Sequence, residues 1–136
     1  MPVARHFIVP VAAFAAVLSA AGAPSAFAAG DPAKGFQVFK GTCGVCHLAR
    51  NDMSSNDAAT KIGPNLYGVV GRKAGSVKRF RYSTAMHDSG VVWTPDMLRR
   101  YAHEPQKTIP NVRMAFPGLT NPKDADDVVA YLGTLK

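Results

Sequence analysis

The chain has 136 residues, of which 47% are hydrophobic and 18% are charged, and this balance is typical of one globular domain. The composition excludes an intrinsically disordered chain and a collagen-like fibre. Sixteen lysine and arginine residues against nine acidic residues give a formal charge of +7, which attracts acidic partners. No nucleic-acid recognition motif accompanies this charge, so we do not expect a nucleic acid as a partner.

The N-terminal residues have the order of a secretory signal peptide. Arg5 is followed by an apolar run over residues 7–18, and small residues then lead to Ala26-Phe27-Ala28. We predict a signal peptide over residues 1–28 with cleavage at its end, a mature domain over residues 29–136, and export to the periplasm. The alternative is an uncleaved membrane anchor, because the apolar and small residues together reach the short limit of a bilayer span.

Polar residues followed by proline predict where the helices of the mature domain begin. A polar N-cap satisfies free backbone N–H groups, and proline fits the first helical position. The chain has this pair at Asp31-Pro32, Thr94-Pro95 and Asn121-Pro122. We predict helices over residues 32–40, over residues 83–88, from residue 95 to about His103 ahead of Pro105, and from Pro122 with Ala125, Val128, Leu132 and Leu135 on one face.

Long irregular segments separate these helices. Residues 48–75 are rich in Asn, Ser, Asp, Gly and Pro, and no stretch of the chain has the alternating pattern of a strand. We therefore predict an all-α fold with long loops. Loops of this length in a small domain need something to pack against, and a bound cofactor meets that need.

The segment Cys43-Gly44-Val45-Cys46-His47 contains Cys-x-x-Cys-His, the attachment pattern for haem c. Two thiols at this spacing can each reach one vinyl group of a porphyrin, and the histidine that follows them is carried under the iron. The alternatives are a thioredoxin-like redox pair, which needs a βαβ context, and a zinc site, which needs a second ligand pair. We predict one haem c bound covalently through Cys43 and Cys46, with His47 as an axial ligand.

The second axial ligand decides whether the iron exchanges electrons or also binds small molecules. Met114 lies in a proline-bracketed loop that is far enough along the chain to reach round the porphyrin. We predict that Met114 is this ligand, because thioether ligation raises the reduction potential and suits an electron carrier. The other candidates are side chains with a free sulfur or nitrogen, namely Met53, Met86, Met97, His87 and His103.

Several further segments are similar to those of class I c-type cytochromes, in the group of mitochondrial cytochrome c and bacterial cytochrome c2. The similar segments occur in the family's order over nearly the whole mature chain: Gly35 and Phe39, the Cys-x-x-Cys-His motif, and residues 63–66, 71–73, 80–83, 91–93 and 109–116. The resemblance implies the small cytochrome c fold, in which short helices and long loops wrap round one covalently bound haem. Four features depart from the family pattern: Asn111 replaces the usual glycine, Val112 replaces the usual threonine, Met86 replaces a common asparagine, and residues 51–60 form an insertion of unknown role.

The resemblance also implies roles for residues around the haem. The Pro64 carbonyl is expected to accept a hydrogen bond from the axial imidazole, and Tyr101 is expected to approach the methionine sulfur. Arg72, Tyr82 and Trp93 are expected near a haem propionate, since a buried anion requires charge-assisted hydrogen bonds. The alternatives are that the two aromatic residues only fill the core and that the arginine is a solvated surface charge.

Basic residues near the haem edge are expected to steer an acidic partner. Lys61, Lys107 and Arg113 match positions of the family's docking ring, whereas Thr42 and Gln106 stand where basic residues are usual. A second basic cluster contains Lys78, Arg79 and Arg81.

Together these features predict a monomeric, periplasmic one-electron carrier that is not an enzyme. The expected partners are acidic redox proteins, namely a bc1 complex, a terminal oxidase, a photosynthetic reaction centre or a periplasmic dehydrogenase. The alternative is a haem peroxidase-like enzyme or a gas sensor in which Met114 leaves the iron. No acid–base pair suited to peroxide cleavage is evident, which disfavours that alternative.

Overall fold

The computed structural model describes residues 30–51 and 62–136. These residues form α1 (Pro32–Gly41), the short 3₁₀ helix η1 (Cys43–Val45), α3 (Thr84–Asp88), α4 (Pro95–His103), α5 (Pro105–Thr108) and α6 (Pro122–Gly133). Apart from one isolated bridge between Lys73 and Val92, the described residues contain no β-structure. The predicted all-α fold class is confirmed. No helix within these two ranges has the length and apolar composition that a membrane crossing requires.

The three longest helices begin where the sequence places a polar residue before proline. Asp31 caps α1 by accepting hydrogen bonds from two backbone N–H groups of the first turn, at 2.9 and 3.2 Å. Thr94 and Asn121 cap α4 and α6 by each accepting one such hydrogen bond, from Met97 at 3.2 Å and from Lys123 at 3.0 Å. Helix α4 ends at His103 as predicted, but Pro105 then occupies the first position of α5, a helix that the sequence analysis did not predict.

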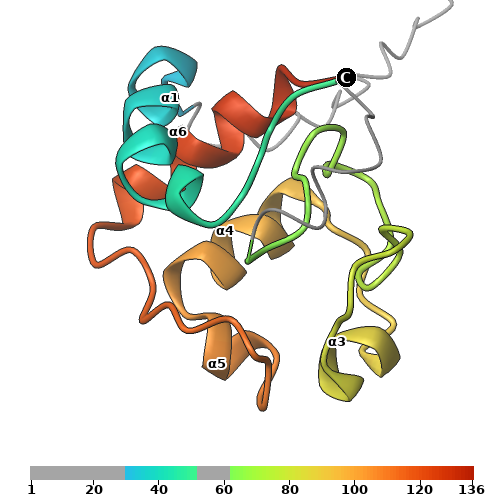
Figure 1. Cartoon of the computed structure of the whole chain (residues 1–136). Coiled ribbons are helices and arrows are strands. Elements are labelled where there is room, and N and C mark those ends of the chain that lie inside the picture. The colour runs from blue at the N-terminus through green and yellow to red at the C-terminus, as the bar shows by residue number, and fades with distance from the viewer. Residues whose placement is uncertain (1–29, 52–61) are drawn as a thin grey trace, which may run out of the picture.

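Helices α1 and α6 lie against each other, and Figure 1 shows them together at the upper left. Gly35 permits a very close approach, because a Cβ atom on Gly35 would lie 1.8 Å from the backbone oxygen of Asp127. Phe39 and Tyr131 pack beside this contact with their ring centroids 5.4 Å apart. The crossing of the first and last helices agrees with the family resemblance. Leu135, expected on the same face of the last helix, lies beyond the end of α6.

Asp127 adds a polar connection between the same two helices. Its carboxylate is buried, accepts a hydrogen bond from the backbone N–H of Asp31 at 2.7 Å, and pairs with the ammonium group of Lys123. Lys123 and then the Asp31 N–H group hold the pKa of Asp127 below its usual range, because both stabilise the carboxylate. The residue that caps α1 is therefore bound to α6 by a charged group.

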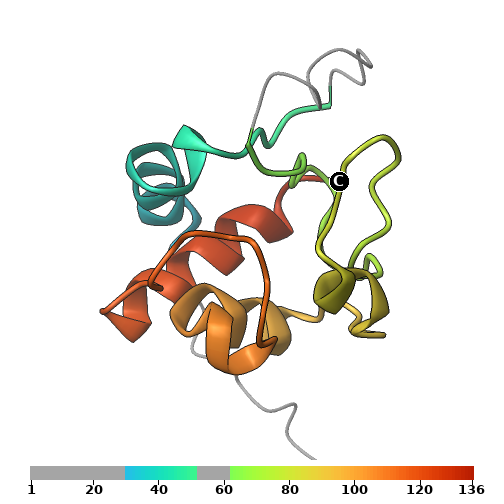
Figure 2. The same cartoon turned by 60° about the horizontal axis from the view of Figure 1, so that its bottom comes forward.

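The loop before α3 is attached to the segment before α4 by backbone hydrogen bonds. The Gly71 N–H donates to the Trp93 carbonyl at 2.9 Å, and the Trp93 N–H donates to the Arg72 carbonyl at 2.9 Å. Helix α3 lies on the opposite side of the molecule from α1 in both views (Figures 1 and 2). Figure 2 also shows the segment after α5 arching across to the start of α6.

Adding a methyl group at Gly35 should separate the first and last helices. We expect Gly35→Ala to lower the free energy of unfolding of the haem-loaded protein by about 1–3 kcal/mol. The new Cβ atom would overlap backbone atoms of Asp127 in α6, so one of the two helices would have to shift. Denaturant unfolding measures this change. Gly41→Ala is the matched control, since a Cβ atom there has no neighbour within 4 Å and alanine favours helix. Equal stabilities of the two variants would contradict the close approach.

Candidate functional site

The two cysteines and His47 lie on one tight turn that follows α1. The backbone N–H groups of Cys46 and His47 both donate to the Cys43 carbonyl, at 3.0 and 2.9 Å. This turn brings the three side chains of the motif together without help from distant parts of the chain. Both cysteines are free thiols, so neither is used in a disulfide.

The His47 imidazole is held in one orientation. Its Nδ1 atom lies 2.8 Å from the Pro64 carbonyl oxygen, and because a carbonyl only accepts, Nδ1 carries the proton. Nε2 therefore keeps its lone pair for a metal, and burial lowers the pKa of His47, which favours this neutral form. Gly63 lies against the ring, since a Cβ atom there would be 2.3 Å from Cε1. Gly63 is a site residue that the sequence analysis did not single out.

These observations fit haem attachment better than the two alternatives. Burial raises the pKa of Cys43 to about 11, so this thiol is not the reactive thiolate that a redox pair requires. Within the described part of the chain no group of three His, Cys, Asp or Glu side chains could hold a metal ion, as a structural zinc site would require. Two free thiols and an imidazole with an available nitrogen are the set that a covalently bound haem needs.

Side-chain hydrogen bonds fix the loop that carries Met114. Gln106 donates to the Val112 carbonyl at 3.0 Å, and Arg113 donates to the carbonyls of Arg81, at 3.3 Å, and Tyr82. Met114 itself is half-buried against the core. The two residues just before the methionine are therefore bound to α5 and to the segment before α3. Neither contact has a local sequence signal, which is why sequence reasoning missed the role of Gln106.

The other candidate ligands have contacts of their own in the structure. Met86 is a buried core residue, and Met97 packs against the core. His87 is exposed and its Nδ1 lies 2.6 Å from the carboxylate of Asp88, while His103 Nδ1 lies 2.5 Å from the Leu119 carbonyl. Met53 lies outside the described residues.

Arg72 is not a solvated surface charge. Its guanidinium donates to the carbonyls of Tyr67 at 2.9 Å and Asn65 at 2.8 Å, and it is half-buried. These acceptors follow Pro64 directly, so Arg72 fixes the loop that orients the His47 imidazole. The remaining N–H groups of Arg72 leave capacity for a further anion.

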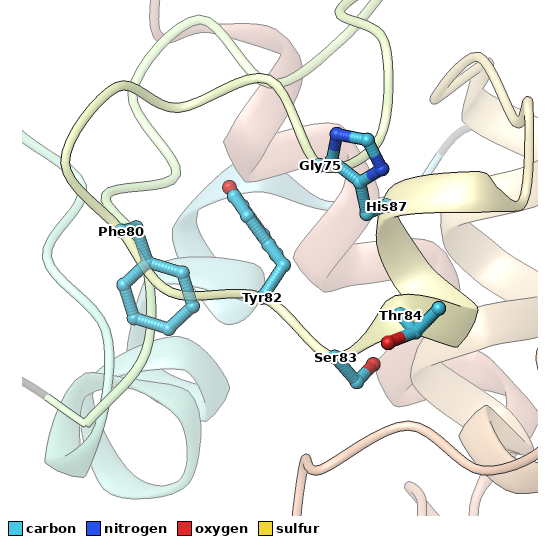
Figure 3. Close-up of a pocket in the computed structure, with 6 residues that line it drawn as sticks. All are labelled: Gly75, Phe80, Tyr82, Ser83, Thr84 and His87. Carbon is cyan, nitrogen blue, oxygen red and sulfur yellow. The ribbon is translucent and has the colours of Figure 1, made fainter.

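The aromatic residues divide between the core and a surface hollow. Trp93 and Tyr101 are buried with ring centroids 5.0 Å apart, and burial raises the pKa of Tyr101 to about 12, so its hydroxyl stays protonated and able to donate. Tyr82 is half-buried and packs edge-on against Phe80 at 4.7 Å. Figure 3 shows Tyr82 between Phe80 and His87 in a hollow of about 240 Å³, which is also lined by Gly75, Ser83 and Thr84.

The structure describes two of the three predicted docking residues, and both are engaged by other groups. Lys61 lies outside the described residues. Lys107 is exposed, but its ammonium group pairs with Glu104 at 2.5 Å, which reduces its field at a distance. The guanidinium of Arg113 is directed at backbone carbonyls, as described above.

Comparisons with known proteins agree with this geometry. The family model of cytochrome c matches residues 32–136. Cytochrome c2 of Rhodopila globiformis is 44% identical over 107 residues, which cover 79% of this chain and 95% of that protein. Cytochrome c of Gibberella zeae is 43% identical over 105 residues, which cover 77% and 94%. The structure is also similar to that of cytochrome cH from Methylobacterium extorquens, with a TM-score of 0.67, 37% identity, and coverage of 77% of this chain and 99% of that one.

A side chain at Gly63 should disturb the axial imidazole. We expect Gly63→Ala to lower the free energy of unfolding of the haem-loaded protein by about 1–3 kcal/mol, because the Cβ atom would overlap the His47 ring. The His47 Nδ1–H resonance of the reduced protein should shift as its hydrogen bond to Pro64 changes. Gly41→Ala should leave that resonance in place. An unchanged resonance in Gly63→Ala would show that the ring tolerates the methyl group.

Proposed function

Because this chain belongs to the cytochrome c family, we propose that it is a periplasmic one-electron carrier whose haem iron is bound axially by His47 and Met114. Family membership gives one covalently bound haem c, attached through Cys43 and Cys46, and a role as an electron carrier. The observation that carries the proposed ligation is the hydrogen bond from His47 Nδ1 to the Pro64 carbonyl, which leaves Nε2 as the only imidazole nitrogen able to bind iron.

The residues of the chain perform the positioning. The haem, when bound, supplies an iron centre that gains and loses one electron. His47 presents a neutral nitrogen from a fixed direction, and the contacts of Gln106 and Arg113 hold the Met114 loop in place. The fixed loops limit how much the site must rearrange when its charge changes, which is what a fast electron carrier needs.

The surroundings of the site favour a carrier over an enzyme. His87 Nδ1 lies beside the Asp88 carboxylate, and His103 Nδ1 lies beside the Leu119 carbonyl, so the bonds of both imidazoles are to groups outside the Met114 loop. Tyr101 keeps its proton and can donate to the methionine sulfur or to a propionate. We propose that Arg72, Tyr82 and Trp93 serve a propionate, as the family resemblance implies.

We propose acidic redox proteins as partners, and a bc1 complex, a terminal oxidase, a photosynthetic reaction centre and a periplasmic dehydrogenase are the classes considered. The formal charge of +7 supports an acidic partner. Lys61, Lys107 and Arg113 are the proposed docking residues. The Lys107–Glu104 ion pair makes this ring less basic than its sequence suggests.

Met114 ligation can be tested by spectroscopy. Oxidised wild-type protein should show the weak far-red absorption band that reports an iron–thioether bond, and Met114→Ala should lose it, gain rapid CO binding in the reduced state, and have a lower reduction potential. Met97→Leu is the control and should keep the band. Retention of the band by Met114→Ala would exclude Met114 as the ligand.

The proposed export depends on cleavage after Ala28. The folded domain begins close to this site, since a Cβ atom on Gly30 would lie 2.1 Å from the backbone oxygen of Asp126. If the signal peptide is removed, protein purified from a host that matures c-type cytochromes should have the mass of residues 29–136 plus one haem. A mass that includes residues 1–28 would indicate an uncleaved anchor instead.

A further inference from the structure

Charge is unevenly distributed along the described chain. Residues 62–87 contain Arg72, Lys73, Lys78, Arg79 and Arg81 and no aspartate or glutamate. The acidic residues of the described part lie elsewhere, at positions 31, 88, 96, 104, 124, 126 and 127. Residues 62–87 therefore carry a net positive charge that no acid within the same range reduces.

Four of these cations, Lys73, Lys78, Arg79 and Arg81, are exposed, and the last three lie close together in the sequence. No acidic side chain of residues 30–51 or 62–136 pairs with Lys78, Arg79 or Arg81. In contrast, ion pairs engage five basic residues of the helices, namely Lys34, Arg99, Arg100, Lys107 and Lys123. The unpaired cations retain most of their field toward solvent.

A fourth cation joins them from the Met114 loop. Arg113 reaches across to the carbonyls of Arg81, at 3.3 Å, and Tyr82, which places its positive charge next to Arg81. A hollow of about 620 Å³ lies at this contact, lined by Tyr82, Ser83, Thr84, Ala85, Asn111 and Arg113. We call Lys78, Arg79, Arg81 and Arg113 the basic edge. Like charges on neighbouring segments repel each other, and an anionic partner would relieve that repulsion.

We propose that the basic edge is a docking surface for an acidic face of a partner protein, centred on Lys78, Arg79 and Arg81 and sharing only Arg113 with the docking residues named above. The proposal rests on the proposed function, since the partner would exchange electrons with the haem. Tyr82 connects the basic edge with the proposed haem site, because it lines the hollow beside the basic edge and is the proposed neighbour of a haem propionate. Docking here would bring the partner to the propionate side of the haem.

The chemistry of the edge fits a protein better than a membrane. The large hydrophobic side chains exposed in the described chain are Phe36, Val45, Ile62 and Val92, and none lies between residues 78 and 82. Phe80 is half-buried and packs against Tyr82, so it offers no apolar anchor for a bilayer. The basic edge offers cations, and the hydroxyl groups of Ser83 and Thr84 line the hollow beside it. Such a surface suits hydrated carboxylates on a partner protein.

The test compares two variants of the haem-loaded protein that lose the same charge. The first combines Lys78→Gln, Arg79→Gln and Arg81→Gln, and the control combines Lys34→Gln, Lys40→Gln and Arg100→Gln on α1 and α4. An octaglutamate peptide is the acidic probe, and backbone amide shifts of the reduced, isotope-labelled protein report where it binds. Native far-red absorption of both variants verifies that each is folded and correctly ligated.

We expect the peptide to shift the amides of residues 78–82 and 113 at low ionic strength and to lose affinity as salt increases. The first variant should bind at least about 10-fold more weakly than wild type, and the control should change about 2-fold or less. Equal weakening of both variants, or shifts centred on Lys107, would overturn the proposal. Binding of wild type to phosphatidylglycerol vesicles through residues 78–82, without any response to the peptide, would overturn it in favour of a membrane.

A second measurement, of electron-transfer kinetics, distinguishes this proposal from the proposed function. Oxidation of the reduced protein by hexacyanoferrate(III) should slow in the first variant more than in the control and become less dependent on salt. Peptide binding at the basic edge by a protein whose iron binds CO freely would refute the carrier function and leave the docking surface standing. Reversible one-electron chemistry with no peptide response at residues 78–82 would support the carrier function and overturn the docking surface.

Discussion

The hydrogen bond between His47 Nδ1 and the Pro64 carbonyl is the constraint on which the site depends. It fixes which imidazole nitrogen is free, and its acceptor is itself held in place. Arg72 donates to the carbonyls of Asn65 and Tyr67 in the loop after Pro64, and the Arg72 carbonyl accepts a hydrogen bond from the Trp93 N–H. Trp93 packs on Tyr101 of α4, and α4 contacts α6. A short series of polar and aromatic contacts therefore connects the His47 imidazole to the helical core and fixes its orientation.

The two sides of the proposed haem site are held by different means. On the His47 side, a tight turn, a buried imidazole and two covalent attachment points act together. On the Met114 side, the loop depends on hydrogen bonds from the side chains of Gln106 and Arg113. Asn111 in the same loop has a φ of 64°, a conformation that asparagine adopts more readily than most residues. The methionine side has fewer constraints, so it is the side where the site would open first.

Local sequence signals predicted much of this structure because they act over a few residues. The polar residue before each proline determined the starts of α1, α4 and α6, and Cys-x-x-Cys-His identified the cofactor. Helix α5 was missed because Pro105 was treated only as the end of α4, although proline also fits the start of a helix. The contacts of Arg72 and Arg113 with backbone carbonyls were missed for another reason: a carbonyl acceptor exists at every residue, so sequence alone does not indicate which one a distant guanidinium reaches.

Net charge and charge placement have different consequences for this protein. A charge of +7 spread evenly would attract an acidic partner without orienting it. Here ion pairs offset much of the positive charge on α1, α4 and α6, whereas residues 62–87 contain no acid. The Lys107–Glu104 pair extends this effect to α5. The proposed docking at the basic edge follows from this distribution, because the orientation of a protein in a field depends on where its unpaired charges lie and not on their sum.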